Sequence, residues 1–415
     1  MSKQILEGVK ILDFGAFMAG PAAAEFLGFL GAEVIKVEHP LRPDGTRFFL
    51  TSPKQLPPDP RTAGSQTYDV NNYGKQSLAL DFKQEEGKEI LWKLIEDTDV
   101  ITQNMSAGTM ERLGFGYEEV RKRKPDIIYL SSSACGEDGP ERDFIGYAAT
   151  FAAKAGLGAL TGYEGYPPST FVGSIDIRSA SFATIALLAA LYHRKKTGLG
   201  QYIEISSQEA IAAQLGEFYL DYSVNGHNQG PMANRRHGYA PQGAYRVLGD
   251  DQWATVSVET QEQWESLCRA IGNPQLASDE RFATYEDRFS HADELDEIIT
   301  AWTKDKEASE VVEKLQAAGV PSGWVYNGKG LHEDPHRRER EAWYAIDSRD
   351  LGKEYVMRPA WRFEKTPVPE TTASPYLGEH SVQILKNRLG MTDQEIAALV
   401  EKRVVRRLLD YDSHL

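Results

Sequence analysis

Short β-branched runs alternate with amphipathic helical patterns over the first half of the sequence. Residues 9–14 and 32–37 are typical of strands, and the apolar stretch 21–30 between them is typical of a helix. A strand, a helix and a second strand in this order indicate a βαβ unit, whose two strands lie parallel. The pattern therefore predicts an α/β fold built on a parallel, Rossmann-like sheet.

The same alternation continues to about residue 224. It predicts helices over residues 85–96, 117–123, 180–194 and 208–219, and strands over residues 100–102, 126–131 and 202–206. Residues 42–67 are rich in Pro, Asp and Ser, so we expect a long loop over the sheet edge there.

The length of 415 residues favours more than one domain, because a single hydrophobic core stops growing at about 250–300 residues. We predict a large Rossmann-like domain over residues 1–224 and a smaller α/β domain over residues 225–330. Residues 331–415 are expected to return to the large domain. The first boundary rests on residues 225–241, which are dense in Gly, Asn, Pro and Arg. The small domain is expected to contain strands at 244–248 and 253–258 and helices at 261–271, 292–302 and 308–318.

The composition of the chain indicates which ligands it can bind and in which compartment it is expected. The formal net charge of −15 argues against nucleic acid as a partner, so an anionic ligand must meet a local basic pocket. Cys135 and Cys268 have no CxxC spacing and are expected to be free thiols, as suits a reducing cytoplasm. The N-terminus lacks an apolar signal core, and the apolar run 183–192 is too short to span a bilayer. We therefore expect a cytoplasmic protein without a membrane segment.

Several common catalytic motifs are missing from the sequence. The glycines of residues 156–162 have the wrong spacing for a dinucleotide fingerprint, and neither GxSxG nor GxxxxGK[ST] occurs. The nine histidines form no HExxH pair or other group with ligand spacing. We therefore predict no catalytic metal, and a nicotinamide dehydrogenase is not expected.

Asp176 lies where a short β-branched run ends and a helical pattern begins. Backbone N–H groups and the positive end of the helix dipole would keep its carboxylate ionised there. An ionised carboxylate can attack a carbonyl carbon. Asp is also a preferred helix N-cap, so the residues alone are compatible with a nucleophile or with a simple cap.

A series of short motifs runs in order along the whole chain. It includes LEGVKILDF at residues 6–14, AGP at 19–21, NYGK at 72–75, CGEDGP at 135–140, TGLGQ at 197–201 and SPYLGEH at 374–380. Each is weak alone, but their order and spacing together are specific. In these motifs the chain resembles the class III coenzyme A transferases of the formyl-CoA transferase and carnitine CoA-transferase type.

The resemblance implies that Asp176 is the catalytic nucleophile of a CoA transferase (EC 2.8.3.-). The carboxylate would attack an acyl-CoA, such as succinyl-CoA, to give a mixed anhydride and a CoA thiolate. The thiolate would then attack the aspartyl carbonyl, releasing the donor acid and leaving an aspartyl-CoA thioester. An acceptor acid would reverse these steps and leave as its own CoA thioester. Coenzyme A thus enters as acyl-CoA substrate, and no metal is implied.

CoA contacts carried over from the family lie along the strand ends. His39 and Ser133 stand where the formyl-CoA enzymes have an arginine and a lysine, so phosphate pairing is expected to be weaker there or taken over by Arg42. The implied CoA-binding residues are Met18, Ala19, His39, Asn72, Tyr73, Gly74, Lys75, Asn104, Met105, Arg112, Ser133, Ala134, Cys135 and Gly136.

Residues 235–243 differ from the glycine-rich loop of the formyl-CoA enzymes. They offer guanidinium groups, an imidazole and a tyrosine ring, which can grip a second carboxylate or stack on an aryl group. We therefore expect a bulky, dicarboxylic or aryl-substituted acceptor rather than formate or oxalate. Solvated linker charges are the open alternative for Arg235 and Arg236. The expected substrate-binding residues are Arg47, Arg235, Arg236 and Tyr239.

Two alternative functions remain open. An α-methylacyl-CoA racemase shares the framework and the aspartate but also needs a histidine, and at the matching segment Tyr147 stands between Gly146 and Ala148. The chain could also be one subunit of a heteromeric aromatic-acid CoA transferase. The resemblance implies an interlocked homodimer or a closely related heterodimer, with an acyl-CoA and a carboxylic acid as its small-molecule partners.

Overall fold

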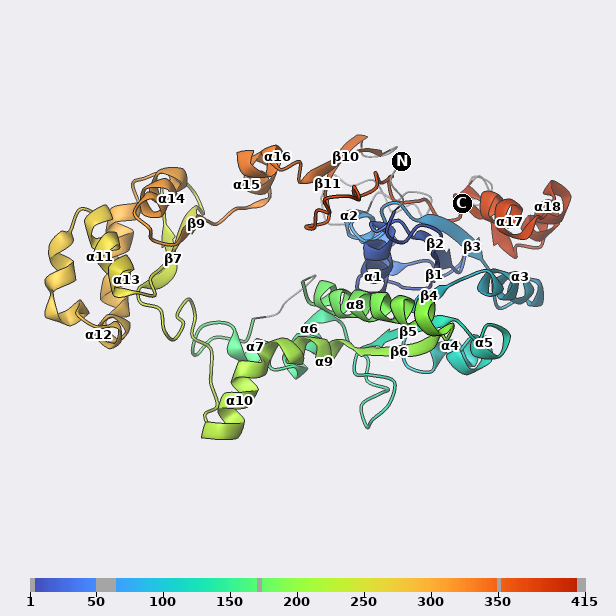
Figure 1. The fold of residues 1–415 in the computed structure, drawn as a ribbon, viewed down its shortest axis with the longest axis horizontal. Helices are drawn as coiled ribbons and strands as arrows, with labels where there is room; N and C mark the ends of the chain where they lie inside the picture. The colour runs from blue at the N-terminus through green and yellow to red at the C-terminus, as the bar shows by residue number, and fades with distance from the viewer. Residues whose placement is uncertain (1–3, 50–64, 170–173, 349–351, 409–415) are drawn as a thin grey trace. The chain divides into compact units, whose positions relative to one another are not determined.

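The computed structural model describes residues 4–49, 65–169, 174–348 and 352–408 (Figure 1). The chain divides into two compact units. The large unit contains residues 1–158, 170–228 and 340–415, and the small unit contains residues 159–169 and 229–339. The predicted domain boundaries at 224 and 330 lie four and nine residues earlier, and residues 159–169 were not expected to join the small unit.

A seven-stranded sheet forms the centre of the large unit, in the order β12-β3-β2-β1-β4-β5-β6. Six of its strands pair in parallel, as predicted. The order 3-2-1-4-5-6 is that of the dinucleotide-binding Rossmann fold. The strands are β1 Lys10–Asp13, β2 Glu33–Glu38, β3 Gln76–Leu80, β4 Val100–Gln103, β5 Ile128–Ser133, β6 Gln201–Ser206 and β12 Val405–Arg406.

Helices pack against both faces of this sheet (Figure 1). Successive side chains of a strand point to opposite faces, so both faces carry apolar residues in a fully covered parallel sheet. The helices of the large unit are α1 Ala19–Gly28, α2 Gln66–Asp69, α3 Glu85–Glu96, α4 Thr109–Leu113, α5 Tyr117–Arg123, α6 Ala148–Lys154, α8 Ser174–Thr197, α9 Ser207–Ala212, α10 Gly216–Asn225, α17 Ser381–Leu389 and α18 Asp393–Glu401, with 3-10 turns at Gly45–Phe48 and Ala213–Leu215.

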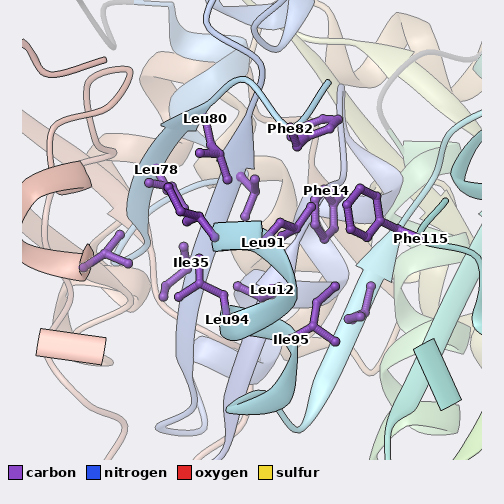
Figure 2. Close-up of a cluster of buried hydrophobic side chains, with 14 of the residues drawn as sticks. Leu12, Phe14, Ile35, Leu78, Leu80, Phe82, Leu91, Leu94, Ile95 and Phe115 are labelled. Carbon is purple, nitrogen blue, oxygen red and sulfur yellow. The ribbon is translucent and has the colours of Figure 1, made fainter. Parts of the chain in front are cut away.

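The core on one face is built by α3 against the first strands. Figure 2 shows Leu91 and Leu94 of α3 among Leu12, Ile35 and Leu78 of the sheet. On the opposite face, α1 and α8 pack through small and branched apolar residues against the alternate strand positions, among them Ala23, Leu27, Ala183, Leu187, Ile11 and Val34. The sheet is therefore held rigidly between two helical layers.

Helix α8 begins earlier and ends later than the predicted range of 180–194. It runs over Ser174–Thr197, so Asp176 lies in its first turn rather than before it. Residues 171–173 of the expected preceding run lie outside the described residues. By length and composition alone, α8 could cross a membrane. Its residues Ala183 and Leu187 pack in the core of the large unit, as in a core helix of a globular protein.

The C-terminal residues return to the large unit. A hairpin of β10 (Trp343–Ser348) and β11 (Gly352–Met357) is followed by α17 and α18. Strand β12 then pairs antiparallel with β3, Val405 facing Leu80, and completes one edge of the sheet.

The small unit contains an antiparallel three-stranded sheet, β7-β8-β9. Helices pack on it around a separate apolar core that includes Trp264, Phe282 and Leu295. Its elements are β7 Gln242–Arg246, β8 Trp253–Ser257, β9 Ser322–Trp324, α11 Gln261–Ala270, α12 Tyr285–Ser290, α13 Ala292–Thr303, α14 Ala308–Ala317, α15 Gly328–Glu333 and α16 Pro335–Glu339, with 3-10 turns at Pro274–Ser278 and Glu280–Phe282; α7 (Leu157–Leu160) spans the boundary between the units.

Candidate active site

A cavity of about 370 Å³ lies at the carboxyl ends of the central strands of the large unit. Its walls come from the segments that follow β1, β4 and β5, and from the first turn of α8. The strand order reverses between β1 and β4, and open α/β sheets bind their ligands at such a point. Of the predicted site residues, the cavity brings together Asp176, Ala19, Asn104, Met105, Ser133 and Ala134.

Asp176 is the third residue of α8, and it lines this cavity. Burial raises the pKa of its carboxyl to about 6, although a backbone hydrogen bond within the first turn opposes that rise. The group is therefore mostly ionised at pH 7. Because it is more basic than an ordinary aspartate, it is also a better nucleophile.

Asn104 holds the loop that follows β1. Its side-chain oxygen accepts a hydrogen bond from the N–H of Ala16 at 2.7 Å, and its amide nitrogen donates to the carbonyl of the same residue at 2.8 Å. A Cβ at Gly20 would lie 2.8 Å from the Asn104 side chain, so glycine is required there. Asn104 thus positions the loop as well as lining the cavity.

Lys75 and Asn72 support the same loop from inside the protein. The buried Lys75 ammonium donates to Asp13 and to the Pro21 carbonyl, both at 2.8 Å, and to the Asn72 side-chain oxygen at 3.0 Å. Burial alone would raise the pKa of Asp13, but Lys75 and Lys36 hold it below its usual value. Because these polar atoms are buried and already bonded, the geometry does not support the expected contact of the two side chains with CoA.

Arg47 is likewise a buried structural cation. Its guanidinium donates to both oxygens of Glu38, at 2.9 and 2.7 Å, and also bonds Tyr68 and the Pro375 carbonyl. The residue is 3% exposed. The expectation that Arg47 binds the substrate therefore needs correction, because its donors are turned into the protein.

His39 does not provide the positive charge of the arginine that it replaces. Its Nε2 lies 3.2 Å from Asp81, and burial lowers the pKa of the imidazole more than this carboxylate raises it. The ring is therefore neutral at pH 7. His39 can therefore donate a hydrogen bond to a phosphate group of CoA, but it cannot form an ion pair with it.

The other predicted CoA contacts lie outside the cavity wall formed by the described residues. Tyr73 donates to Glu354 at 2.8 Å, and Gly74 follows it in a second cavity of about 270 Å³. Arg112 donates to Thr109 at 2.8 Å and to the Ala107 carbonyl at 3.3 Å. Three more residues flank lining segments: Met18 precedes α1, and Cys135 and Gly136 follow Ala134.

Phe17, Arg142 and Tyr147 are among the lining residues that were not expected as site residues. The Arg142 side chain is 46% exposed and has a loose ion pair, at 3.7 Å, with Asp143. Tyr147 had a signal in the sequence, because it replaces the racemase histidine. For Phe17 and Arg142 no local pattern gives such a signal.

The predicted substrate residues of the small unit are engaged within that unit. Arg235 pairs with Asp293 at 2.9 Å and with Asp296 at 2.7 Å. The Arg236 guanidinium lies over the ring of Tyr239 at 5.1 Å. The idea that Arg235 grips a second carboxylate therefore needs correction, since two aspartates already neutralise it.

No group of three or more His, Cys, Asp or Glu side chains that could hold a metal ion occurs among the described residues. The absence of a catalytic metal stays a prediction.

Residues 6–381 match the family described as CoA-transferase family III. The chain belongs to this family. It is 32% identical to the succinyl-CoA–D-citramalate CoA-transferase of Chloroflexus aurantiacus over 96% of this chain and 98% of that protein. It is 31% identical to the succinyl-CoA–L-malate CoA-transferase beta subunit of the same organism over 96% and 98%.

A solved structure of a CAIB/BAIF family protein from Brucella suis is also similar to this family III chain. The TM-score is 0.84 at 28% identity, over 93% of this chain and 100% of that chain. The resemblance seen in the motifs is thereby confirmed, and the chain is a family III CoA-transferase.

Proposed function

We propose that this CoA-transferase moves CoA from succinyl-CoA, or a similar short acyl-CoA, to a dicarboxylic acid through covalent intermediates on Asp176. The proposal rests on the environment of the Asp176 carboxylate. It is partly desolvated in the first turn of α8 and lines a cavity at the point where the strand order reverses.

The expected chemistry needs only this carboxylate and the two substrates. One Asp176 oxygen attacks the thioester carbonyl, and the C–S bond breaks to give the mixed anhydride and CoA thiolate. Attack of the thiolate on the aspartyl carbonyl expels the donor carboxylate and leaves the aspartyl-CoA thioester. The acceptor carboxylate then displaces the thiolate, which returns to the acceptor carbonyl and frees Asp176.

Support for a dicarboxylic acceptor comes from the relatives and from Arg142. The two curated relatives are named for D-citramalate and L-malate, both dicarboxylic acids. Arg142 lines the cavity, and its one ion pair among the described residues is loose, so its guanidinium is suited to an anionic group of the acid or of CoA. Arg235, which was expected to grip the second carboxylate of the acceptor, gives no such support, because Asp293 and Asp296 already pair with it.

Substitution of Asp176 by alanine tests the covalent role. Transfer from succinyl-CoA to a panel of dicarboxylic acids, followed by mass spectrometry, should fall below detection. CoA binding and the far-UV circular dichroism spectrum should stay close to those of the unmodified protein, because the side chain has little structural role. Hydroxylamine added during turnover should label the peptide that contains Asp176. Full transfer in the variant, or a label on another carboxylate, would overturn the proposal.

A heteromeric enzyme is the second candidate, because one relative is named as the beta subunit of a CoA-transferase. Activity of the purified chain alone separates the two possibilities: transfer without a second subunit would exclude the heteromeric requirement. The racemase alternative has less support, because Tyr147, not a histidine, lines the cavity that contains Asp176.

A further inference from the structure

Phe17 has an unusual backbone conformation at the wall of the cavity. Its φ is +61°, in the left-handed region that bulky side chains rarely adopt. Such a conformation costs about 1–3 kcal/mol and persists only when the surroundings hold it in place. Strained residues of this kind cluster at binding and catalytic sites.

A buried ion pair holds this conformation. The N–H of Phe17 donates to one oxygen of Asp44 at 3.1 Å, and the other oxygen of Asp44 accepts from Lys36 at 2.9 Å. The Lys36 ammonium also donates to the carbonyl of Gly15 at 2.7 Å. Asp44 and Lys36 are both fully or nearly buried. The loop is therefore tied to the protein interior on Phe17 itself and two residues before it.

The conformation directs the Phe17 ring against Tyr147. Their ring centroids lie 5.4 Å apart at an interplanar angle of 67°, the edge-on arrangement that aromatic pairs prefer. The two residues come from the segment after β1 and the segment before α6, and both line the cavity that contains Asp176. Two aromatic rings from distant parts of the chain thus form one continuous side of the candidate site.

We propose that Phe17 and Tyr147 form an aromatic wall that limits the size of the acyl group accepted at Asp176. The inference rests on the proposed function, because the reacting carbonyl must come within about 3–3.5 Å of the attacking carboxylate. The cavity of about 370 Å³ must hold the thioester end of CoA as well as the acyl group, so little space is left for the acyl group. Because both rings line the same cavity as Asp176, they bound that space. Short acyl groups fit beside the wall, and an aryl group does not.

A purely structural role would give a different result. If the rings only pack on each other, shortening either one changes stability and leaves acyl preference unchanged. If they bound the acyl site, shortening either one enlarges the site and admits a larger acyl group.

Equilibrium binding distinguishes these roles without turnover. In an Asp176→Asn background, titration calorimetry would measure the dissociation constants of acetyl-CoA, succinyl-CoA and benzoyl-CoA. Phe17→Ala and Tyr147→Ala should each raise the affinity for benzoyl-CoA relative to acetyl-CoA about tenfold, equivalent to about 1.4 kcal/mol. Tyr192→Ala is the matched control, because this tyrosine of α8 is 62% exposed and lies away from the cavity wall. An unchanged ratio in both wall variants would overturn the inference.

Phe17→Gly protects the test against a folding defect. Glycine adopts positive φ without strain, so this variant should melt no lower than Phe17→Ala while lacking the ring. Transfer by the protein with Asp176 intact is measured separately. If CoA is transferred but the wall variants leave the ratio of the benzoyl-CoA and acetyl-CoA affinities unchanged, the wall is refuted and the proposed chemistry stands. If that affinity ratio shifts but no CoA is transferred, the wall is supported and the proposed chemistry is refuted.

Discussion

At the scale of the residue, the Asp176 carboxyl combines two opposing influences. Burial raises its pKa to about 6, and the first turn of α8 supplies a backbone hydrogen bond that favours the ionised form. The outcome is a carboxylate that is charged at neutral pH yet retains basicity. An exposed aspartate with a pKa near 3.8 would be charged but less nucleophilic.

This pKa predicts how transfer depends on pH. Only the ionised carboxylate attacks, so kcat/KM should fall about tenfold per pH unit below about pH 6. The measurement is the rate of transfer from succinyl-CoA between about pH 5 and pH 8. A rate that stays level down to about pH 5 would show that Asp176 is not the group that titrates.

The raised pKa of Asp176 also lowers the stability of the folded state at neutral pH. The folded-state pKa lies above the unfolded value of 3.8, so the folded state binds the proton more tightly. The ionised group therefore destabilises the fold at pH 7, and this penalty disappears as the pH falls through about 6 towards 4. Asp176→Asn should raise the free energy of unfolding by about 1 kcal/mol at pH 7, allowing for partial exposure, and by nothing near pH 4. Urea denaturation at both pH values checks this.

Substitution of Lys75 tests whether its buried ammonium group stabilises the loop that lines the candidate site. In Lys75→Met, Asp13 loses its ion-pair partner and stays buried, which should cost about 3–5 kcal/mol of unfolding free energy. Lys88→Met is the control, because its pair with Glu85 is exposed and should contribute less than about 0.5 kcal/mol. Urea denaturation measures both variants. Weaker CoA binding with unchanged stability would instead support direct contact between Lys75 and CoA.

At the scale of the element, the sequence was informative where local pattern decides the structure. Helices α3 and α5 have the predicted bounds. Helix α3 carries a regular apolar stripe, and α5 has acidic residues in its first turn and basic residues in its last, which favours a helix. The strand β3 was not predicted, and the start of α8 was placed too late. Strand β3 follows a segment whose conformation depends on a contact with a residue far away in the sequence, that of Lys75 with Asp13.

The same distinction applies to the candidate site. Motif order located Asp176, Asn104 and Ser133, which line one cavity. Phe17 and Arg142 were not expected, because their place in the wall arises from the folded loops and not from spacing along the chain. Buried cations such as Arg47 were assigned to ligands because a sequence does not reveal which carboxylate, here Glu38, will meet them.

At the scale of the whole molecule, an exposed apolar groove of about 860 Å³ lies on the large unit. Ile185 and Leu188 of α8 line it together with Tyr355 and Met357 of β11, and Ile185 is 67% exposed. Large exposed apolar surfaces mark interaction sites. The family resemblance implies an interlocked dimer, and we propose that this groove is covered in that dimer.

Sedimentation equilibrium tests the dimer. The chain should sediment as a dimer at micromolar concentration, and Ile185→Glu should weaken association because it buries a charge in the groove. Leu199→Glu, at an exposed position outside the groove, is the control. A stable folded monomer of the unmodified chain would contradict the proposal.

The insertion of the small unit between parts of the large unit has a consequence for synthesis on the ribosome. Every residue of the small unit has been added by residue 339, whereas the large unit still lacks β10 to β12, α17 and α18. Until Val405 has been translated and has emerged, the edge of β3 has no partner. Until then the nascent chain carries a complete inserted unit and an open sheet edge, so it needs protection against aggregation up to the point at which Val405 emerges.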